Sequence, residues 1–135
     1  MTFEELDKRF PNGFDDAQII SIKIDYSNRQ ARLKISLRGN PPEDPNRDEY
    51  RRAELTILGF YYISIEPPDA DHLFYPGLSN VTVDGMPEDP KQFPLFELLQ
   101  PKLAAGAFCC RFFVHDWNSF IHLAAKDAEF SWIDG

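Results

Sequence analysis

Apolar and polar residues alternate along much of this chain, which is the pattern of a half-buried β-strand. In residues 20–26 the even-numbered positions are apolar, and Ile19 is the one apolar residue on the polar side. A polar turn at 27–30 follows, and the alternation then resumes in 33–37. Two alternating runs around a short polar turn predict an antiparallel hairpin with one solvated face.

A longer apolar run extends from about residue 52 to residue 65. Its middle is apolar on both faces, which predicts a strand in the centre of the sheet. Gly59 interrupts this run and predicts a bend or a β-bulge, because glycine weakens a regular strand. Beyond it we expect a short strand at 81–83 and an acidic, proline-containing loop at 84–90.

The last third of the chain predicts a second hairpin with a defined register. If its loop is centred between Asp116 and Trp117, then Arg111 faces His122 and both apolar sets fall on the same face of the sheet. A short, separate final strand is expected around 130–132.

Two short helices complete the expected fold. Residues 2–10 have an apolar face and a capping box, in which Thr2 and Glu5 each bond to the other's backbone amide. Residues 93–99 predict the second helix. We therefore expect residues 1–135 to form a single α+β domain, an antiparallel β-sheet of six or seven strands with one or two short helices.

Nearly all of the excess negative charge lies between Ala53 and Pro90. The chain has 14 basic and 22 acidic residues, and this window contains seven carboxylates and no Lys or Arg. A concentrated acidic surface repels nucleic acid and anionic membranes and attracts basic proteins. The window thus predicts a basic protein partner, no nucleic acid and no membrane. The alternative interpretation is that these residues are solvated loops that keep the protein soluble.

A partner-binding surface would use the acids of this window together with a tryptophan at the tip of the second hairpin. A loop-tip tryptophan either folds back over the core or stands out as an interface anchor, and both interpretations remain open. The candidate partner-binding residues are Glu66, Asp69, Asp71, Glu88, Asp89 and Trp117.

Aromatic residues make up 14% of the chain, which suggests a second function. Phe60, Tyr62 and Phe113 are candidates to line a cleft for a small molecule, since ligand pockets favour aromatic side chains. A β-rich core uses the same residues, and a homodimer is also compatible with this surplus.

A thiol enzyme is the third hypothesis, because Cys109 and His122 lie diagonally opposite on one face of the predicted hairpin. An inert cysteine beside a surface histidine is the alternative. Cys109 and Cys110 are adjacent in a strand and cannot form an ordinary disulfide, which suits a reducing cytoplasm.

The sequence begins without a basic and apolar leader, which likewise predicts a cytoplasmic protein. The histidines lack the spacing of a zinc site, and the acidic residues lack the pattern of an EF-hand loop. We therefore expect no metal and no cofactor.

Residues 14–25 (FDDAQIISIKID) resemble the opening of a loose group of small bacterial proteins, in which a Phe-His-Asp-(Ala/Ser) turn leads into an alternating hairpin. Some members are similar to immunity proteins that neutralise the toxins of neighbouring bacteria. The match covers residues 14–37, with a fainter one at 117–132, and Asp15 stands where histidine is usual. The resemblance implies a cytoplasmic, β-rich fold and an immunity-like role. We therefore expect first of all a non-enzymatic protein-binding module.

Overall fold

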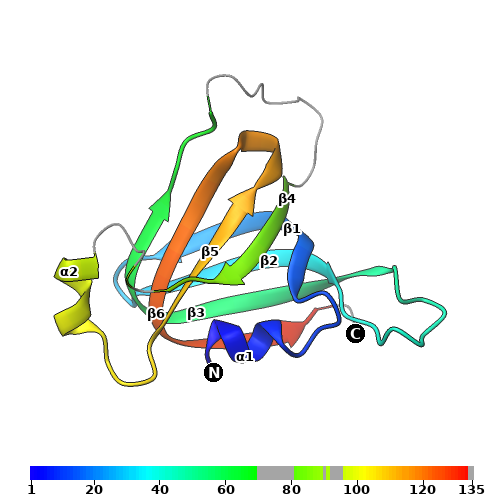
Figure 1. Ribbon diagram of the computed structural model, residues 1–135, viewed down its shortest axis with the longest axis horizontal. Coiled ribbons are helices and arrows are strands. Elements are labelled where there is room, and N and C mark those ends of the chain that lie inside the picture. Colours follow the sequence, from blue (N-terminus) through cyan, green and yellow to red (C-terminus); the bar gives the residue numbers. More distant parts are fainter. Residues whose placement is uncertain (70–80, 90, 92–95, 134–135) are drawn as a thin grey trace.

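Six antiparallel strands close into a barrel in the computed structural model, which describes residues 1–69, 81–89, 91 and 96–133 (Figure 1). The order around the barrel is β1-β2-β3-β6-β5-β4, and β4 pairs with β1 to close it. The elements are α1 (Phe3–Asp7), β1 (Phe14–Asp25), β2 (Gln30–Arg38), β3 (Tyr50–Ile65), β4 (Val81–Pro87), α2 (Phe96–Leu99), the 3₁₀ turn η2 (Gln100–Lys102), β5 (Phe108–Val114), the 3₁₀ turn η3 (His115–Trp117) and β6 (Ser119–Trp132).

The prediction of a mostly antiparallel β protein with two short helices is confirmed. Closure into a barrel is more specific than that prediction, and it depends on the pairing of β1 with β4 across more than sixty residues of sequence. Among the helices of the described residues, none has the length and apolar character that a membrane span requires.

The second hairpin has the predicted register, with Arg111 opposite His122. A separate strand at 130–132 was a wrong prediction, because β6 continues without a break to Trp132. The expected loop at 84–90 was also partly wrong, since β4 extends to Pro87 and pairs with both β1 and β5.

A β-bulge changes which residues of β1 face the core. Ile19 pairs with Ile35 and Ser21 pairs with Lys34, so Ile20 is an extra residue on the β1 side. Ile19 is therefore buried, although strict alternation had placed it on the polar face. Beyond the bulge, Ile22 and Ile24 are half-buried and pack against the core as expected, whereas Tyr26, which follows the strand, is exposed and was wrongly expected to face inward.

β3 pairs along both edges, as its apolar run predicts, with β2 on one side and β6 on the other; in the closed barrel every other strand does so too. Gly59 has a positive φ of 60°, which an L side chain adopts only with strain. The register with β6 shifts directly after it, between Phe60 and Tyr62, so the predicted bulge is confirmed.

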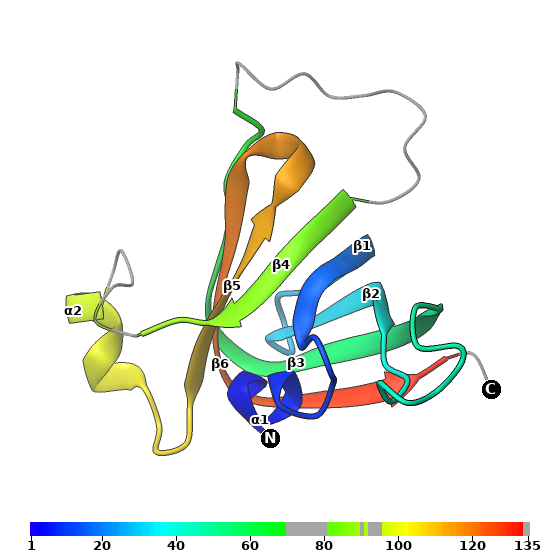
Figure 2. The same cartoon turned by 45° about the vertical axis from the view of Figure 1, so that its right-hand side comes forward.

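α1 lies at the lower end of the barrel in both views (Figures 1 and 2). A cluster of aromatic rings packs between this helix and the strands. The Phe3 ring stacks on Phe14 at 4.7 Å and meets the edge of Phe112 at 5.6 Å. All three side chains are fully buried. Phe14 and Phe112 come together across Gly85, where an added Cβ would lie 2.6 Å from the Phe112 ring and 2.9 Å from the Cβ of Phe14.

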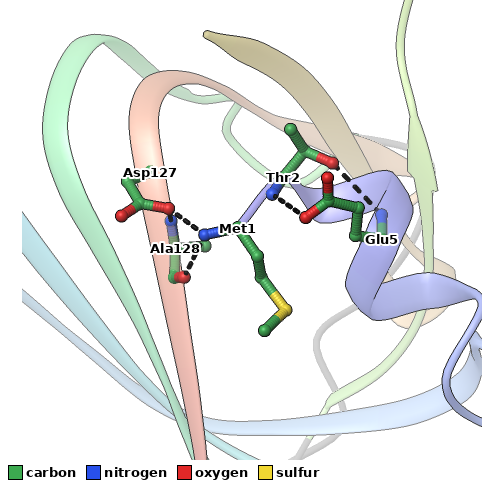
Figure 3. Close-up of polar contacts among 5 residues, drawn as sticks. All are labelled: Met1, Thr2, Glu5, Asp127 and Ala128. Carbon is green, nitrogen blue, oxygen red and sulfur yellow. Dashed lines mark hydrogen bonds and ion pairs between the residues drawn. The ribbon is translucent and has the colours of Figure 1, made fainter. Parts of the chain in front are cut away.

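Two sets of polar contacts hold the first residues of the chain, one between Met1 and β6 and one between Thr2 and Glu5 (Figure 3). The Met1 ammonium donates to the Asp127 carboxylate and to the Ala128 carbonyl, and the first of these bonds holds the pKa of Asp127 below its usual range. The predicted capping box is present, with the Glu5 amide donating to Thr2 Oγ1 at 3.2 Å and the Thr2 amide donating to Glu5 Oε2 at 3.2 Å. The Met1 contacts thus hold the residue before α1 against β6, and the capping box stabilises the first turn of the helix.

We expect Gly85→Ala to lower the free energy of unfolding by about 1–3 kcal/mol, because neither ring can move away from the new methyl group. Urea denaturation would measure this change. Phe112→Leu in the same background should recover part of the loss. If the two changes destabilise the protein additively, the proposed clash at Gly85 is wrong.

Candidate functional site

The described candidate partner-binding residues fall into two groups on the outer face of β3, β4, β5 and β6. One group lies where β3 ends and η3 joins β5 to β6. The other follows the end of β4, where the Glu88 amide donates to the Cys109 carbonyl at 2.9 Å. The two places are roughly 13 Å apart along β5, at about 3.3 Å per residue. Asp71 lies outside the described residues.

Backbone and side-chain hydrogen bonds bring Glu66, Asp69 and Trp117 together. The Asp69 amide donates to the Trp117 carbonyl at 2.8 Å, and Asn118 Nδ2 donates to Asp69 Oδ2 at 3.0 Å. Glu66 Oε1 accepts from the Phe120 amide at 2.7 Å, while the Glu66 amide donates to the Phe120 carbonyl at 3.0 Å. The end of β3 is thus tied to the tip of the second hairpin.

Trp117 is partly buried and packs against the main core. This position matches the interpretation of a ring that folds back over the core. The remainder of the side chain stays accessible beside Asp116, which is also partly exposed.

Two further acids and a histidine extend this end of the barrel. Asp84 Oδ1 accepts from the Asp16 amide at 2.8 Å, and Asp84 Oδ2 lies 2.7 Å from His115 Nε2. Burial raises the pKa of Asp84, but these two hydrogen bonds outweigh it and leave the pKa below its usual range. Burial also raises the pKa of Asp15, with the nearby Asp84 charge as the second cause.

Asp16, Asp84 and His115 could hold a divalent cation. Each offers one ligand atom, and the three atoms all lie within 4.8 Å of one another. Two carboxylate oxygens and an imidazole nitrogen are ligands that zinc and manganese accept. No local sequence pattern indicates this group, because its members come from β1, β4 and η3 and meet only after the barrel closes.

Glu88 is part of the barrel wall. Its side chain is only 2% exposed, and its Oε2 lies 3.1 Å from Nδ1 of His122, whose side chain is also largely buried. Asp89, the next residue, is exposed. Of the two acids in this second group, therefore, only Asp89 presents its side chain to solvent.

The environment of Cys109 suppresses its reactivity. The residue is buried beside Leu99, the last residue of α2, and Ala124 of β6. Burial, with Glu88 and Asp89 as further causes, raises the pKa of the thiol to about 11. Near neutral pH the group is a neutral thiol, whereas a nucleophilic cysteine needs a lowered pKa.

The structure brings together two of the three aromatic residues predicted to line a cleft. Phe60 and Tyr62 line a groove of about 410 Å³, together with Ile24 and the exposed Tyr26. Phe113 lies elsewhere on the outer face, with its ring 5.2 Å from that of Phe120.

Comparisons with known proteins add no relative: no protein-family model matches the chain, and neither the curated proteins nor the solved structures gave a match.

We expect alkylation of Cys109 by iodoacetamide to be slow near neutral pH in the folded protein. Its rate should rise about tenfold per pH unit, because only the thiolate reacts, until the pH approaches the thiol pKa of about 11. Mass spectrometry of a Cys110→Ala variant would follow this single thiol, and the unfolded variant gives the reference rate. A rate that levels off below the ordinary thiol pKa of 9.0 would show an activated cysteine instead.

Proposed function

We propose that this chain is a non-enzymatic protein-binding module that recognises a basic partner through one end of its barrel. We name this surface the acidic end and define it by Glu66, Asp69, Asp84, Asp116 and Trp117. The convergence of these residues supports the proposal: hydrogen bonds connect segments about fifty residues apart into one charged rim around a partly exposed tryptophan.

The segments that form the acidic end are poor in basic residues. Residues 66–69, 82–86 and 115–120 contain no Lys or Arg. Carboxylates within a Debye length of one another add their fields, which speeds encounter with a positively charged protein and disfavours anionic ones. The part of the Trp117 side chain that stays accessible beside these acids adds apolar area to such a contact.

An immunity-like role in the cytoplasm is the specific form of this proposal. An enzyme that cleaves nucleic acid must be basic where it holds phosphates, so an acidic inhibitor is complementary to its substrate channel. The resemblance of residues 14–37 to immunity-like bacterial proteins agrees with this role.

Binding of a small apolar molecule is the second candidate, and the groove beside Phe60 and Tyr62 favours it. The groove also includes Ile63 and Ile65, so its lining is mostly apolar and aromatic. Its volume of about 410 Å³ is within the range of small-molecule sites.

To test the acidic end, we would neutralise Glu66, Asp69 and Asp116 as Gln or Asn and use the immobilised protein to capture partners from a lysate of its own organism. We expect the wild type to retain a basic protein and the neutralised variant to lose most of it. Raising the salt concentration should weaken retention by the wild type, because salt screens exposed charges.

A matched control neutralises Glu43, Asp48 and Glu49, three exposed acids of the β2–β3 connection. This control has the same net charge as the first variant, so it should retain the partner as the wild type does. Equal retention by all three proteins, or equal loss from both variants, would contradict an interface at the acidic end.

For the groove, we expect 1-anilinonaphthalene-8-sulfonate to fluoresce on binding the wild type and to do so less with Tyr26→Asp, because the charge disfavours an apolar ligand. Leu98→Asp changes another exposed apolar residue away from the groove and is the control. Fluorescence that falls equally in both variants would argue against ligand binding in the groove.

A further inference from the structure

A smaller pocket is lined by residues of the connection that follows α1 and of the connection from β2 to β3. Its volume is about 200 Å³. Asn12 lines it from the first connection, and Arg38, Asn40, Arg47 and Asp48 line it from the end of β2 and the second connection. The lining therefore contains two guanidinium groups and two amides against a single carboxylate.

Arg38 is held in place and has a donor without an acceptor. Its guanidinium lies over the Tyr50 ring, with Cζ 5.1 Å from the ring centroid, and the Tyr50 hydroxyl donates to the Asp16 carbonyl at 2.9 Å. Arg38 Nε is buried and has no hydrogen-bond partner within the described part of the chain. A buried N–H on a cation is unfavourable unless it meets an acceptor, most of all a charged one.

Arg47 adds a second cation to the same pocket. Among the residues that the structure describes, neither Arg38 nor Arg47 has a carboxylate within ion-pair distance, although Asp48 lines the pocket with them. This is unusual in a chain whose acidic residues outnumber its basic ones by 22 to 14. Within the described residues, the two cations therefore share a pocket without an ion pair to a carboxylate.

The connection that carries Arg47 is well ordered by internal bonds. Asn40 Nδ2 donates to the Asn46 carbonyl at 2.9 Å, and the Arg47 amide donates to the Asp44 carbonyl at 3.1 Å. Asp44 Oδ1 also accepts from the Asn46 amide at 2.8 Å. A preorganised loop loses little conformational entropy when a ligand binds.

We propose that this pocket binds a small oxyanion of the phosphate class, either free phosphate or the phosphoryl group of a small monoester. A guanidinium presents paired N–H donors that match two oxygens of such an anion, and stacking on an aromatic ring holds the plane of the Arg38 group. The volume suits a phosphoryl group with a small substituent. This site uses other residues than the acidic end and does not depend on the proposed protein partner.

The test is a titration followed by NMR, with inorganic phosphate and glycerol 3-phosphate as separate probes. We expect a saturable shift of the Arg38 Nε–Hε resonance and of the Asn12 side-chain amide at millimolar phosphate or below. Tighter binding of the monoester than of phosphate would identify the substituent as part of the ligand, and equal binding would identify the phosphoryl group alone. Sodium chloride at equal ionic strength should not produce the saturable shift.

Three variants separate a built site from general charge. Arg47→Gln should weaken binding about tenfold or more, since it removes a charge-assisted contact. Asp48→Asn should tighten binding several-fold, because it removes the one carboxylate of the lining. Arg32→Gln, an exposed arginine earlier on the same strand as Arg38, should leave binding unchanged.

The proposal is overturned if the wild type shows no saturable shift with either probe, or if chloride gives the same shift. It is also overturned if Arg32→Gln weakens binding as much as Arg47→Gln does, because the affinity for the anion would then depend only on the net charge of the protein. Arg47 is exposed on a surface connection, so its variant should fold, and the unchanged remainder of the spectrum would verify this.

Discussion

The contact of Phe14 with Phe112 across Gly85 is the constraint on which the rest of the structure depends. Because Gly85 has no side chain, the two rings can meet inside the barrel, and Phe3 of α1 then stacks on them. This contact draws the start of β1 against β4, which is the pairing that turns a sheet into a closed barrel. A closed barrel has no long unpaired edge to attract a second chain.

Closure also creates the local geometry of the acidic end. The register between β1 and β4 shifts after Phe14, and Asp16 adopts a positive φ of 56° in this irregular segment. The shift aims the Asp16 amide at Asp84, whose other oxygen meets His115. A residue in a left-handed conformation is strained, and here three hydrogen-bonded segments hold it in place.

Local patterns were enough to predict the parts of the fold that adjacent segments determine. The register of β5 with β6, the bulge at Gly59 and the capping box at Thr2 all follow from residues close together in sequence or from the two-residue period of a strand. The bulge at Ile20 was missed because the one exception to the alternation, Ile19, was assigned to the polar face instead of being recognised as the mark of an inserted residue. The pairing of β1 with β4 was missed because no short-range signal specifies it.

The acidic window shows why a run of like charges in sequence does not define a surface. Asp84 lies in β4 and Glu88 directly follows the end of the same strand, yet the surroundings of the two carboxylates differ. Asp84 stays partly exposed at the rim, whereas Glu88 is covered and paired with His122. Burying a carboxylate is unfavourable unless a partner meets it, so only folding reveals which acids remain available.

The two proposed sites carry opposite charge and yet are connected through one side chain. The Tyr50 ring supports the Arg38 guanidinium, and the Tyr50 hydroxyl donates to the carbonyl of Asp16. The Asp16 amide donates in turn to Asp84 of the acidic end. The arginines of the pocket and the carboxylates of the acidic end coexist because their side chains contact different groups, such as the Tyr50 ring for Arg38 and His115 for Asp84. Within the described residues, no ion pair joins Arg38 to Asp16. Charges that cancelled each other there would leave neither surface able to select a partner by its sign.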